Sequence, residues 1–410
     1  MGGMRRCLIA VTLAITLVLT GCTHSGDPSA PAGNSPAAPA PFQLEMTPAN
    51  GATNVPSSAE IGITAKNGQL TEVSVSPAGG AALPGDMRQD GSSWVPAAPL
   101  AYGTTYTAKV TGKGADGKPV TKTSTFSTMA KPGHVIGTGL YMFDGQTVGV
   151  GMPVVIEFDT EVPESGRAAV QQRLFVNTVP PQPGVWHWAS GRQVWYRAPE
   201  YWKPGTVISV RSALQGVPMG DGWYGDSDRA ATATVGQKVV MDVDNGSKQM
   251  SVYVNDQLAR QMPVSLGKPS TPSSSGSMVT MSHDYSTIFD TTNEGPGGYR
   301  VQVNYAMRLT WGGEFIHAAP WSVGDQGVRN VSHGCVNMSM GNAEWLFGIT
   351  HVGDPVTVRG TEVQLSNGNG WTAWNQPWSE YVKGSALPVP PQLAAGTPPS
   401  AAAGAAKPPR

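Results

Sequence analysis

The sequence predicts a mainly β protein built from several domains, and three observations support this fold class. Of the 410 residues, 51 are glycine, 35 are proline and only 13% are charged, a composition typical of strands and turns. Short runs of alternating apolar and polar residues recur from residue 43 onward, separated by turn pairs such as Asn67-Gly68 and Asp116-Gly117. The length suits several domains of about 150 residues each. We therefore expect two β-sandwiches in tandem, followed by a further β-rich domain.

The N-terminus resembles an export signal. Arg5 and Arg6 precede an apolar run from Cys7 to Leu19, which is too short to span a bilayer comfortably. The run ends in Leu-Thr-Gly-Cys22, similar to the lipobox of bacterial lipoproteins, in which the cysteine is acylated and becomes the mature N-terminus. We expect residues 1–22 to be a lipoprotein signal that attaches the protein to a membrane through lipid on Cys22. An ordinary signal peptide and an uncleaved anchor are the alternatives.

Two Pro/Ala-rich segments lie at the ends of the folded part. Residues 23–42 and 386–410 consist mainly of proline, alanine, serine and glycine. Such segments cannot bury enough apolar surface to fold. We expect 23–42 to be a stalk and 386–410 to be a disordered tail.

Residues 43–130 and 131–235 repeat one plan of short strands and turns. The first contains runs such as "AEIGITA" and "TTYTAKVTG", and the second contains "MPVVIEFD" and "QVWYRA". This spacing predicts two β-sandwiches of immunoglobulin type without the disulfide. The turns "AYGTTYT" from Ala101 and "KPGTVIS" from Lys203 occupy matching late positions, which supports a tandem pair.

Aromatic residues are concentrated in two stretches. Those of the second sandwich alternate on short strands, which favours packing inside the protein over a sugar-binding platform: Trp186, Trp188, Trp195, Tyr196 and Trp202. A Trp-rich C-terminal subdomain, residues 361–385, carries the others: Trp371, Trp374, Trp378 and Tyr381. We expect this subdomain to pack against the third domain.

Residues 236–360 form the third domain, and its pattern predicts two hairpins. Apolar residues alternate on both sides of Asn245-Gly246, a strong hairpin turn. The second hairpin turns at Gly312-Gly313 and places His317 at the exit of a strand, on the same face as Phe315. Between them, residues 268–298 are rich in serine, threonine, glycine and proline. A loop of that length is usually functional, typically a lid.

"VSHGCVN", residues 331–337, contains the candidate nucleophile Cys335. The other two cysteines lie in the first 22 residues, so this thiol has no disulfide partner. Ser339 is a good N-cap for a short helix that begins just past it. Positive charge at that helix N-terminus favours a thiolate. A buried, inert thiol is the alternative interpretation.

A working thiol needs a base, and His317 and His333 are the candidates. His333 lies two residues from Cys335, where extended geometry splays the side chains apart, so we favour His317. One cysteine and two histidines also match a zinc ligand set, but their spacing does not, and we expect no metal or other cofactor. The 27 basic and 28 acidic residues nearly balance, which argues against a nucleic-acid partner.

The spacing of these residues resembles a family signature. His317, fourteen further residues and then "SHGCVN" from Ser332 to Asn337 is similar to the signature of the L,D-transpeptidases with a YkuD-type catalytic domain. "FIHAAPWS" and "GGYR" also resemble that family. The order of stalk, two immunoglobulin-like domains, catalytic domain and Trp-rich tail resembles its mycobacterial-type members. The resemblance covers residues 43–382 and is strongest over 238–360.

The resemblance implies a role for each signature residue. Cys335 would attack a peptide carbonyl, His317 would accept its proton, and the backbone carbonyl of Ala318 would orient His317. The N–H groups of Gly334 and Cys335, with the Tyr299 hydroxyl, would stabilise the oxyanion. The substrate would be bound by Ser332, His333, Asn337 and Tyr299. Residues 281–304 would form the lid, which is shorter than in some relatives.

The function implied by the resemblance is synthesis of the cell wall. The protein would be lipid-anchored on the outer face of the cytoplasmic membrane and would form 3→3 cross-links between peptidoglycan stem peptides, with tetrapeptide stems as acyl donors. Carbapenem β-lactams would acylate Cys335. A hydrolytic cysteine amidase and a binding protein that has lost activity are the rival hypotheses. Against the amidase, papain-like hydrolases have the cysteine before the histidine in sequence, whereas here His317 comes first.

Overall fold

The computed structural model describes residues 40–88, 91–292 and 299–395, and it confirms the mainly β fold class. The predicted signal with Cys22, the stalk up to residue 39 and the tail beyond residue 395 lie outside the described residues. No helix in the described ranges is long and apolar enough to cross a membrane.

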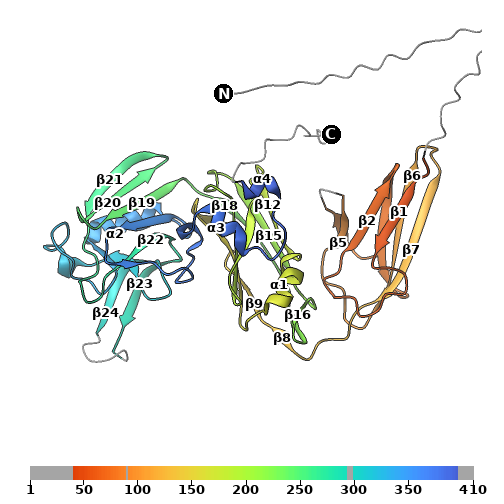
Figure 1. Cartoon of the computed structure of the whole chain (residues 1–410), viewed down its shortest axis with the longest axis horizontal. Coiled ribbons are helices and arrows are strands. Elements are labelled where there is room, and N and C mark those ends of the chain that lie inside the picture. The colour runs from red at the N-terminus through yellow and green to blue at the C-terminus, as the bar shows by residue number, and fades with distance from the viewer. Residues whose placement is uncertain (1–39, 89–90, 293–298, 396–410) are drawn as a thin grey trace, which may run out of the picture. The chain divides into compact units, whose positions relative to one another are not determined.

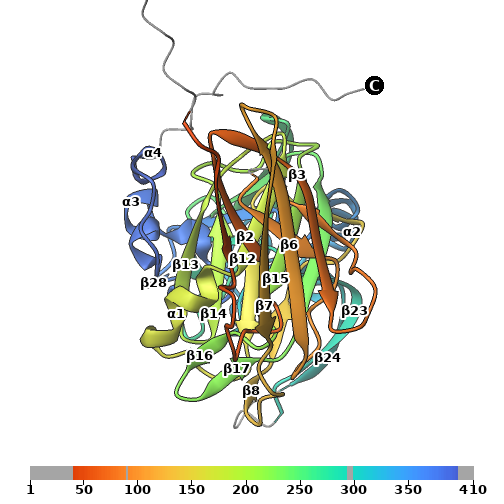
Figure 2. The same ribbon diagram turned by 90° about the vertical axis from the view of Figure 1, so that its right-hand side faces the viewer.

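The first β-sandwich packs a four-stranded sheet against a three-stranded one. Buried Ile61, Val75 and Phe126 belong to its core, and Phe42, predicted as the last stalk residue, packs on that core. Figure 2 shows β6 and β7 side by side. The four-stranded sheet has the order β1 (Gln43–Thr47), β2 (Ile61–Lys66), β5 (Ser93–Pro96), β4 (Gly85–Met87), and the other has β3 (Gly68–Pro77), β6 (Thr105–Gly114), β7 (Pro119–Ser127).

The second β-sandwich has two four-stranded sheets and one helix. One sheet has the order β10 (Gln146–Val148), β18 (Asp228–Val235), β15 (Val207–Ala213), β12 (Leu174–Val179). The other has β13 (Val185–Ser190), β14 (Gln193–Arg197), β11 (Val154–Phe158), β9 (Thr138–Leu140). A small sheet adds β16 (Pro218–Gly220), β17 (Trp223–Gly225), β8 (Val135–Ile136), and the helix is α1 (Glu164–Gln171).

Both sandwiches contain the turn that the sequence placed at matching positions, "AYGTTYT" from Ala101 and "KPGTVIS" from Lys203. Gly103 and Gly205 both have positive φ, at 59° and 80°, just before β6 and β15. The Gly103 N–H donates to Met129 O, and the Gly205 N–H donates to Val235 O. In each sandwich the turn is therefore hydrogen-bonded to the chain at or just after the end of the last strand, which is consistent with the expected tandem pair.

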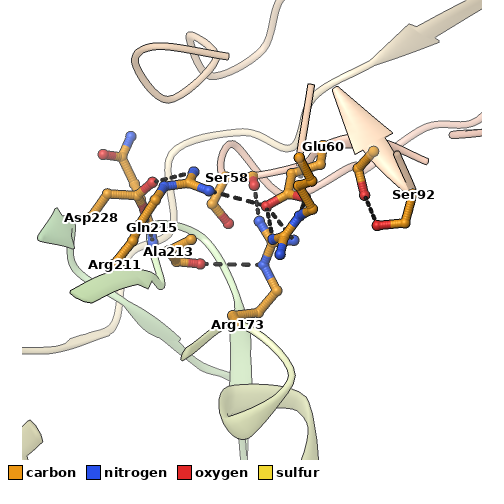
Figure 3. A network of polar contacts seen from close by, with 10 residues as sticks. Ser58, Glu60, Ser92, Arg173, Arg211, Ala213, Gln215 and Asp228 are labelled. Carbon is orange, nitrogen blue, oxygen red and sulfur yellow. Dashed lines mark hydrogen bonds and ion pairs between the residues drawn. The ribbon is translucent and has the colours of Figure 1, made fainter. Parts of the chain in front are cut away.

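A carboxylate surrounded by arginines links the two sandwiches (Figure 3). Glu60, just before β2, lies 2.6 Å from Arg88, 3.0 Å from Arg211 and 3.8 Å from Arg173. Burial alone would raise the pKa of Glu60, but the hydrogen bond and charge of Arg88 and the charges of the other two arginines lower it. The Arg88 guanidinium also lies 3.7 Å from the ring centroid of Phe175. The contact therefore combines ion pairs with cation–π packing.

The third part contains a six-stranded and a four-stranded sheet, with β23 and β24 side by side in Figure 1. The first has the order β21 (Gln257–Pro263), β20 (Gln249–Val254), β19 (Val239–Asp244), β27 (Pro355–Arg359), β22 (Ser274–Val279), β28 (Val363–Gln364). The second has β23 (Ser282–Asp290), β24 (Arg300–Arg308), β25 (Phe315–Ala318), β26 (Val336–Met338). The helices are the 3-10 turn η1 (Pro320–Ser322) and α2 (Met340–Ile349).

The predicted hairpins form, with one change of turn. Strands β24 and β25 pair across the Gly312-Gly313 turn, as expected. Strands β19 and β20 pair out to Asp244 opposite Gln249, which leaves a four-residue turn instead of the two-residue Asn245-Gly246 turn. Lys248 takes a positive φ of 55° in that turn. The extra residues are accommodated because the Asp244 side chain accepts the Ser247 N–H at 2.7 Å.

The prediction that residues 268–298 form one long loop is wrong. This stretch contains β22 and β23, and only its last residues, 293–298, lie outside the described residues. Strand β22 is rich in serine, but Met278 and Val279 are buried and β22 pairs with β27 on one side and β28 on the other. Pairing on both sides satisfies the backbone of a strand whose composition alone indicates a loop. In the described part of the predicted lid, 281–304, β23 pairs antiparallel with β24.

The C-terminal segment packs mainly on the second sandwich, contrary to expectation. Trp371 and Tyr381 join its buried core, which also contains all five aromatics predicted to pack there. The Trp374 indole donates to Gly151 O at 2.6 Å, and Arg197 of β14 donates to Ala373 O at 3.1 Å. Buried Arg197 needs acceptors, and the segment supplies them. The contact to the third domain is smaller, for example the Ser277 N–H donating to the Asn375 side chain at 3.0 Å.

The described end of the chain is more ordered than its composition predicts. The segment contains η2 (Ala373–Asn375), α3 (Trp378–Tyr381), η3 (Val382–Gly384) and α4 (Pro391–Ala394). The expected disordered tail begins at 386, but Leu393 is buried and its carbonyl accepts the Trp378 indole N–H at 2.6 Å. The Ala386 N–H also donates to the Gln171 side chain at 2.8 Å, so the first residues of the expected tail contact the second sandwich.

Candidate active site

A cavity of about 480 Å³ in the third part of the chain brings the predicted residues together. The strands β23 to β25 contribute Phe289, Val301 and His317. The remaining predicted side chains on its wall are Tyr299, Ser332, His333, Cys335 and Asn337. Residues from distant parts of the signature thus meet in one place.

The parallel pairing of β25 with β26 explains why Cys335 and His317 meet. Ile316 pairs with Val336 and His317 with Asn337, so Cys335, just before β26, lies beside Phe315. Side chains two residues apart on a strand share a face. The Phe289 ring accordingly lies 4.6 Å from that of Phe315 and 5.2 Å from that of His317, between ring centroids. The expectation that Phe315 and His317 share a face is confirmed.

His317 is buried and oriented by its neighbour's backbone. His317 is only 4% exposed, and its Nδ1 lies 2.8 Å from the carbonyl oxygen of Ala318. A carbonyl can only accept, so Nδ1 carries the proton and Nε2 is the basic nitrogen. Burial lowers the pKa of His317, although the hydrogen bond to Ala318 opposes that shift. The result is a neutral imidazole with a defined tautomer.

Cys335 differs from the expectation of a ready thiolate. The residue is 6% exposed, and its Sγ donates to Gly313 O at 3.7 Å, with no hydrogen bond to His317 in this part of the structure. Burial raises the pKa of Cys335 to about 12; a hydrogen bond from the Phe315 backbone lowers it, and the charge of Glu314 raises it further. The predicted helix forms, with Ser339 accepting the Asn342 N–H at 3.3 Å, but β26 separates it from the thiol. Desolvation is therefore the largest influence on the thiol pKa, and it disfavours the thiolate.

The backbone conformation at position 334 requires glycine, and the Gly334 N–H makes a hydrogen bond within its own turn. Its φ of +121° is a conformation that other residues rarely adopt. The N–H donates to Ser332 Oγ at 3.1 Å, while that hydroxyl donates to Cys335 O at 2.6 Å. Ser332 therefore closes the turn before the nucleophile. The Ser332 hydroxyl therefore accepts the Gly334 N–H that was expected to stabilise the oxyanion.

The other predicted residues surround the thiol at the cavity wall. The Tyr299 and His333 rings lie 5.0 Å apart, and His333 Nε2 lies 2.9 Å from Lys268 Nζ. Asn337 donates to Ser322 Oγ at 3.3 Å, and its side-chain oxygen is buried without a partner among the described residues.

Sequence reasoning missed three residues that support the site. Ser273 is buried and donates to Gly334 O at 2.6 Å, which holds the nucleophile turn from behind. Glu314 accepts the Ser274 N–H at 2.7 Å, next to the thiol's acceptor Gly313. Lys268 lies on the same segment as Ser273. The segment that contains Lys268 and Ser273 was interpreted as a loop, and no sequence motif marks its polar residues as part of a site. Only their contacts in the structure show that they support it. No group of three His, Cys, Asp or Glu side chains within the described ranges has the geometry of a metal site.

Comparison with known proteins decides the family. Residues 52–218 match the family model for a bacterial Ig domain, and residues 238–358 match that for the L,D-transpeptidase catalytic domain. L,D-transpeptidase 2 of Mycobacterium tuberculosis is 35% identical over 84% of this chain and 85% of its own length. L,D-transpeptidase 5 of the same species is 35% identical over 88% of this chain and 80% of its own length. The chain belongs to the L,D-transpeptidase family.

Membership makes the cavity at Cys335 the candidate active site of a transferase. In this L,D-transpeptidase, the residues of the expected signature lie on β25, on β26 and in the turn between Ser332 and Cys335. Among solved structures, that of LD transpeptidase LdtMt1 in complex with imipenem is 33% identical over 55% of this chain and 99% of that chain, with a TM-score of 0.46.

Proposed function

We propose that this L,D-transpeptidase forms 3→3 cross-links in peptidoglycan through an acyl-enzyme on Cys335, with residues 236–360 as its catalytic domain. One observation carries the proposal: the thiol and His317 line one cavity, and the imidazole is held at 2.8 Å by Ala318 O. A thiol nucleophile needs a base that a third group orients. This arrangement supports Cys335 as nucleophile, His317 as base and Ala318 O as the orienting group.

Acylation begins with a tetrapeptide stem attacked at the carbonyl of its third residue. Rotation about the Cα–Cβ bond of Cys335 moves Sγ from Gly313 O toward His317. Nε2 of His317 takes the thiol proton as Sγ bonds to the carbonyl carbon. The bond to the terminal D-Ala then breaks, and the leaving amine takes the proton from His317. Because the proton is transferred during attack, a thiol whose pKa is raised by burial can still react.

Transfer completes the reaction. The side-chain amine of a third residue on another stem attacks the thioester, gives a proton to His317, and releases Sγ, which recovers that proton. Transfer instead of hydrolysis requires that water be kept from the thioester. Phe289 and Val301 of the β23–β24 hairpin, with Trp321, supply apolar surface around the cavity for this purpose.

Tyr299 and the backbone N–H of Cys335 are our candidates for the oxyanion donors. The Gly334 N–H joins them only if Ser332 releases it, because the Ser332 hydroxyl accepts it at 3.1 Å. One such donor is typically worth about 3 kcal/mol of transition-state stabilisation. Ser332, His333 and Asn337, which line the same cavity, would bind the stem peptide.

Two mass-spectrometric measurements test the proposal. Carbapenems present a strained carbonyl that Cys335 would attack, so intact mass should show one adduct per chain, absent in Cys335→Ala. Given a tetrapeptide stem and an amine acceptor, the wild type should release D-Ala and form the 3→3 dimer. A pentapeptide stem should be a poor donor. If only hydrolysed tripeptide forms even at high acceptor concentration, the amidase hypothesis replaces this one.

We further propose that the protein is anchored by lipid on Cys22 to the outer face of the cytoplasmic membrane. The support is the Leu-Thr-Gly-Cys sequence after a short apolar run. Several acyl chains hold a protein firmly on a membrane. The mature wild type should partition into detergent, and Cys22→Ala should not. An unmodified N-terminus on mature wild type would contradict the proposal.

A further inference from the structure

A basic pair lies at the edge of the candidate active site. Lys268 Nζ is 2.9 Å from His333 Nε2, and His333 lines the cavity that contains Cys335. An ammonium group only donates, so Nε2 accepts and the imidazole is neutral with its proton on Nδ1. Burial, and then the charge of Lys268, lower the pKa of His333. The pair therefore carries one positive charge and a second donor.

Among the described residues Lys268 has no acidic partner, unlike two other cations of this domain. Arg329 pairs with Asp325 at 2.5 Å, and Arg300 pairs with Asp290 at 3.5 Å. Across the described ranges, no ion pair involves Lys268. Asp325 also lines the cavity, but its carboxylate is paired with Arg329 at 2.5 Å. A cation beside an imidazole, with no ion-pair partner among the described residues, is suited to an anionic ligand.

The backbone of Lys268 is fixed to the nucleophile segment. Its N–H donates to Ser332 O at 2.9 Å, and Thr271 Oγ1 donates to the same oxygen at 3.3 Å. Ser332 is three residues before Cys335 and is itself bonded to Cys335 O. The base of the lysine side chain is therefore held in a defined position relative to the thiol.

We propose that Lys268, together with His333, binds the terminal carboxylate of the donor stem and selects stems that end one residue past the attacked bond. This inference rests on the proposed function. In a tetrapeptide donor the carboxylate belongs to the leaving D-Ala, next to the attacked carbonyl. A pentapeptide has an amide at that point, and its carboxylate lies about 3.5 Å further along the chain. A cation beside a residue that lines the cavity of Cys335 can thus distinguish the two donors by charge.

Donors that differ only in this charge test the inference. We would measure kcat/KM for release of D-Ala from a tetrapeptide acid and of D-alaninamide from the matching C-terminal amide. For wild type we expect the acid to be favoured about tenfold or more, the typical strength of a charge-assisted hydrogen bond. In Lys268→Met the ratio should fall toward one, and Lys268→Arg should restore most of it. High salt should lower the ratio for wild type.

Arg300→Met is the matched control, because Arg300 is a cation next to the cavity-lining Val301 that already pairs with Asp290, and Asp290 does not line the cavity. Its acid-to-amide ratio should equal that of wild type. A ratio unchanged in Lys268→Met, even with lower activity on both donors, would overturn the inference but leave the proposed function intact. The same holds if wild type shows a ratio near one. If wild type releases neither D-Ala from the acid nor D-alaninamide from the amide, the proposed function fails and this inference fails with it.

Discussion

His317 and His187 have the same local contact, yet they lie in very different surroundings. His317 Nδ1 lies 2.8 Å from Ala318 O, and His187 Nδ1 lies 2.6 Å from Tyr381 O. The two residues are 4% and 8% exposed, and burial lowers the pKa of both. Neither burial, tautomer nor pKa direction separates the candidate base from the structural histidine.

The other side of each ring makes the difference. His187 is stacked on Tyr381, with ring centroids 4.6 Å apart, and faces Trp195 at 6.1 Å. His317 faces a cavity that it shares with a thiol. A held imidazole becomes a base only where space for a substrate lies beside it. At His187, the hydrogen bond to Tyr381 O instead joins β13 to the C-terminal segment.

The largest expected effect separates the two histidines by activity. His317→Ala should slow formation of the carbapenem adduct by roughly a hundred- to ten-thousandfold, because a positioned proton-transfer group is lost. The adduct rate is measured by intact mass over time. His187→Ala, assayed on the folded fraction, serves as control and should stay within a few fold of wild type. Equal losses of adduct rate in both variants would contradict the distinction between a base at His317 and a structural residue at His187.

The next effect separates them by stability. His187→Ala removes a stacked, hydrogen-bonded ring from a packed interface and should lower the free energy of unfolding by about 3 kcal/mol. Urea unfolding followed by tryptophan fluorescence measures it. Gly384→Ala should act similarly, since its Cβ would lie 2.1 Å from His187 Nδ1. His317→Ala should cost less, because one side of its ring already faces a cavity. A larger loss for His317→Ala would contradict this view.

Thiol reactivity tests how closed the cavity is. Burial raises the pKa of Cys335 to about 12, so iodoacetamide should alkylate it at pH 8 at least tenfold more slowly than free cysteine, whose pKa is about 8.5. The rate should keep rising with pH where free cysteine has levelled off. The assay needs a soluble form that begins after the stalk, so that Cys335 is the single thiol. Fast alkylation below pH 7 would instead favour the thiolate expected from the sequence.

The smallest effect concerns pH. Burial and the charge of Arg197 lower the pKa of His187, while its hydrogen bond to Tyr381 opposes the shift. Below about pH 6.5 the unfolded chain binds a proton that the folded chain does not, so stability should fall as pH decreases through that value. The slope of unfolding free energy against pH should be smaller in His187→Gln. An unchanged slope would show that His187 does not contribute to it.

Local patterns predicted much of the fold and the identity of the site. Alternation located the β19–β20 hairpin, the Gly312-Gly313 turn signal located the pairing of β24 with β25, and Ser339 located α2. The spacing from His317 to Cys335 indicated one site, and the parallel pairing of β25 with β26 brings those residues together. Each of these predictions depends on residues close in sequence or on the pairing of two strands. The strands hidden in the serine-rich stretch from 268 were missed because their stability comes from β27 and β28, far along the chain.

The sequence by itself determined which residues could do chemistry: a lone thiol, a histidine at signature spacing, and a glycine before the nucleophile. Tertiary structure decided what state they are in. Desolvation raises the pKa of the Cys335 thiol, and the Ser332 hydroxyl accepts the Gly334 N–H. Lys268 reaches His333 across 65 residues of chain, and the Trp-rich segment packs on the second sandwich because Arg197 needs carbonyl partners there. Burial and hydrogen-bond competition depend on everything that surrounds a group, and no local pattern of residues records that.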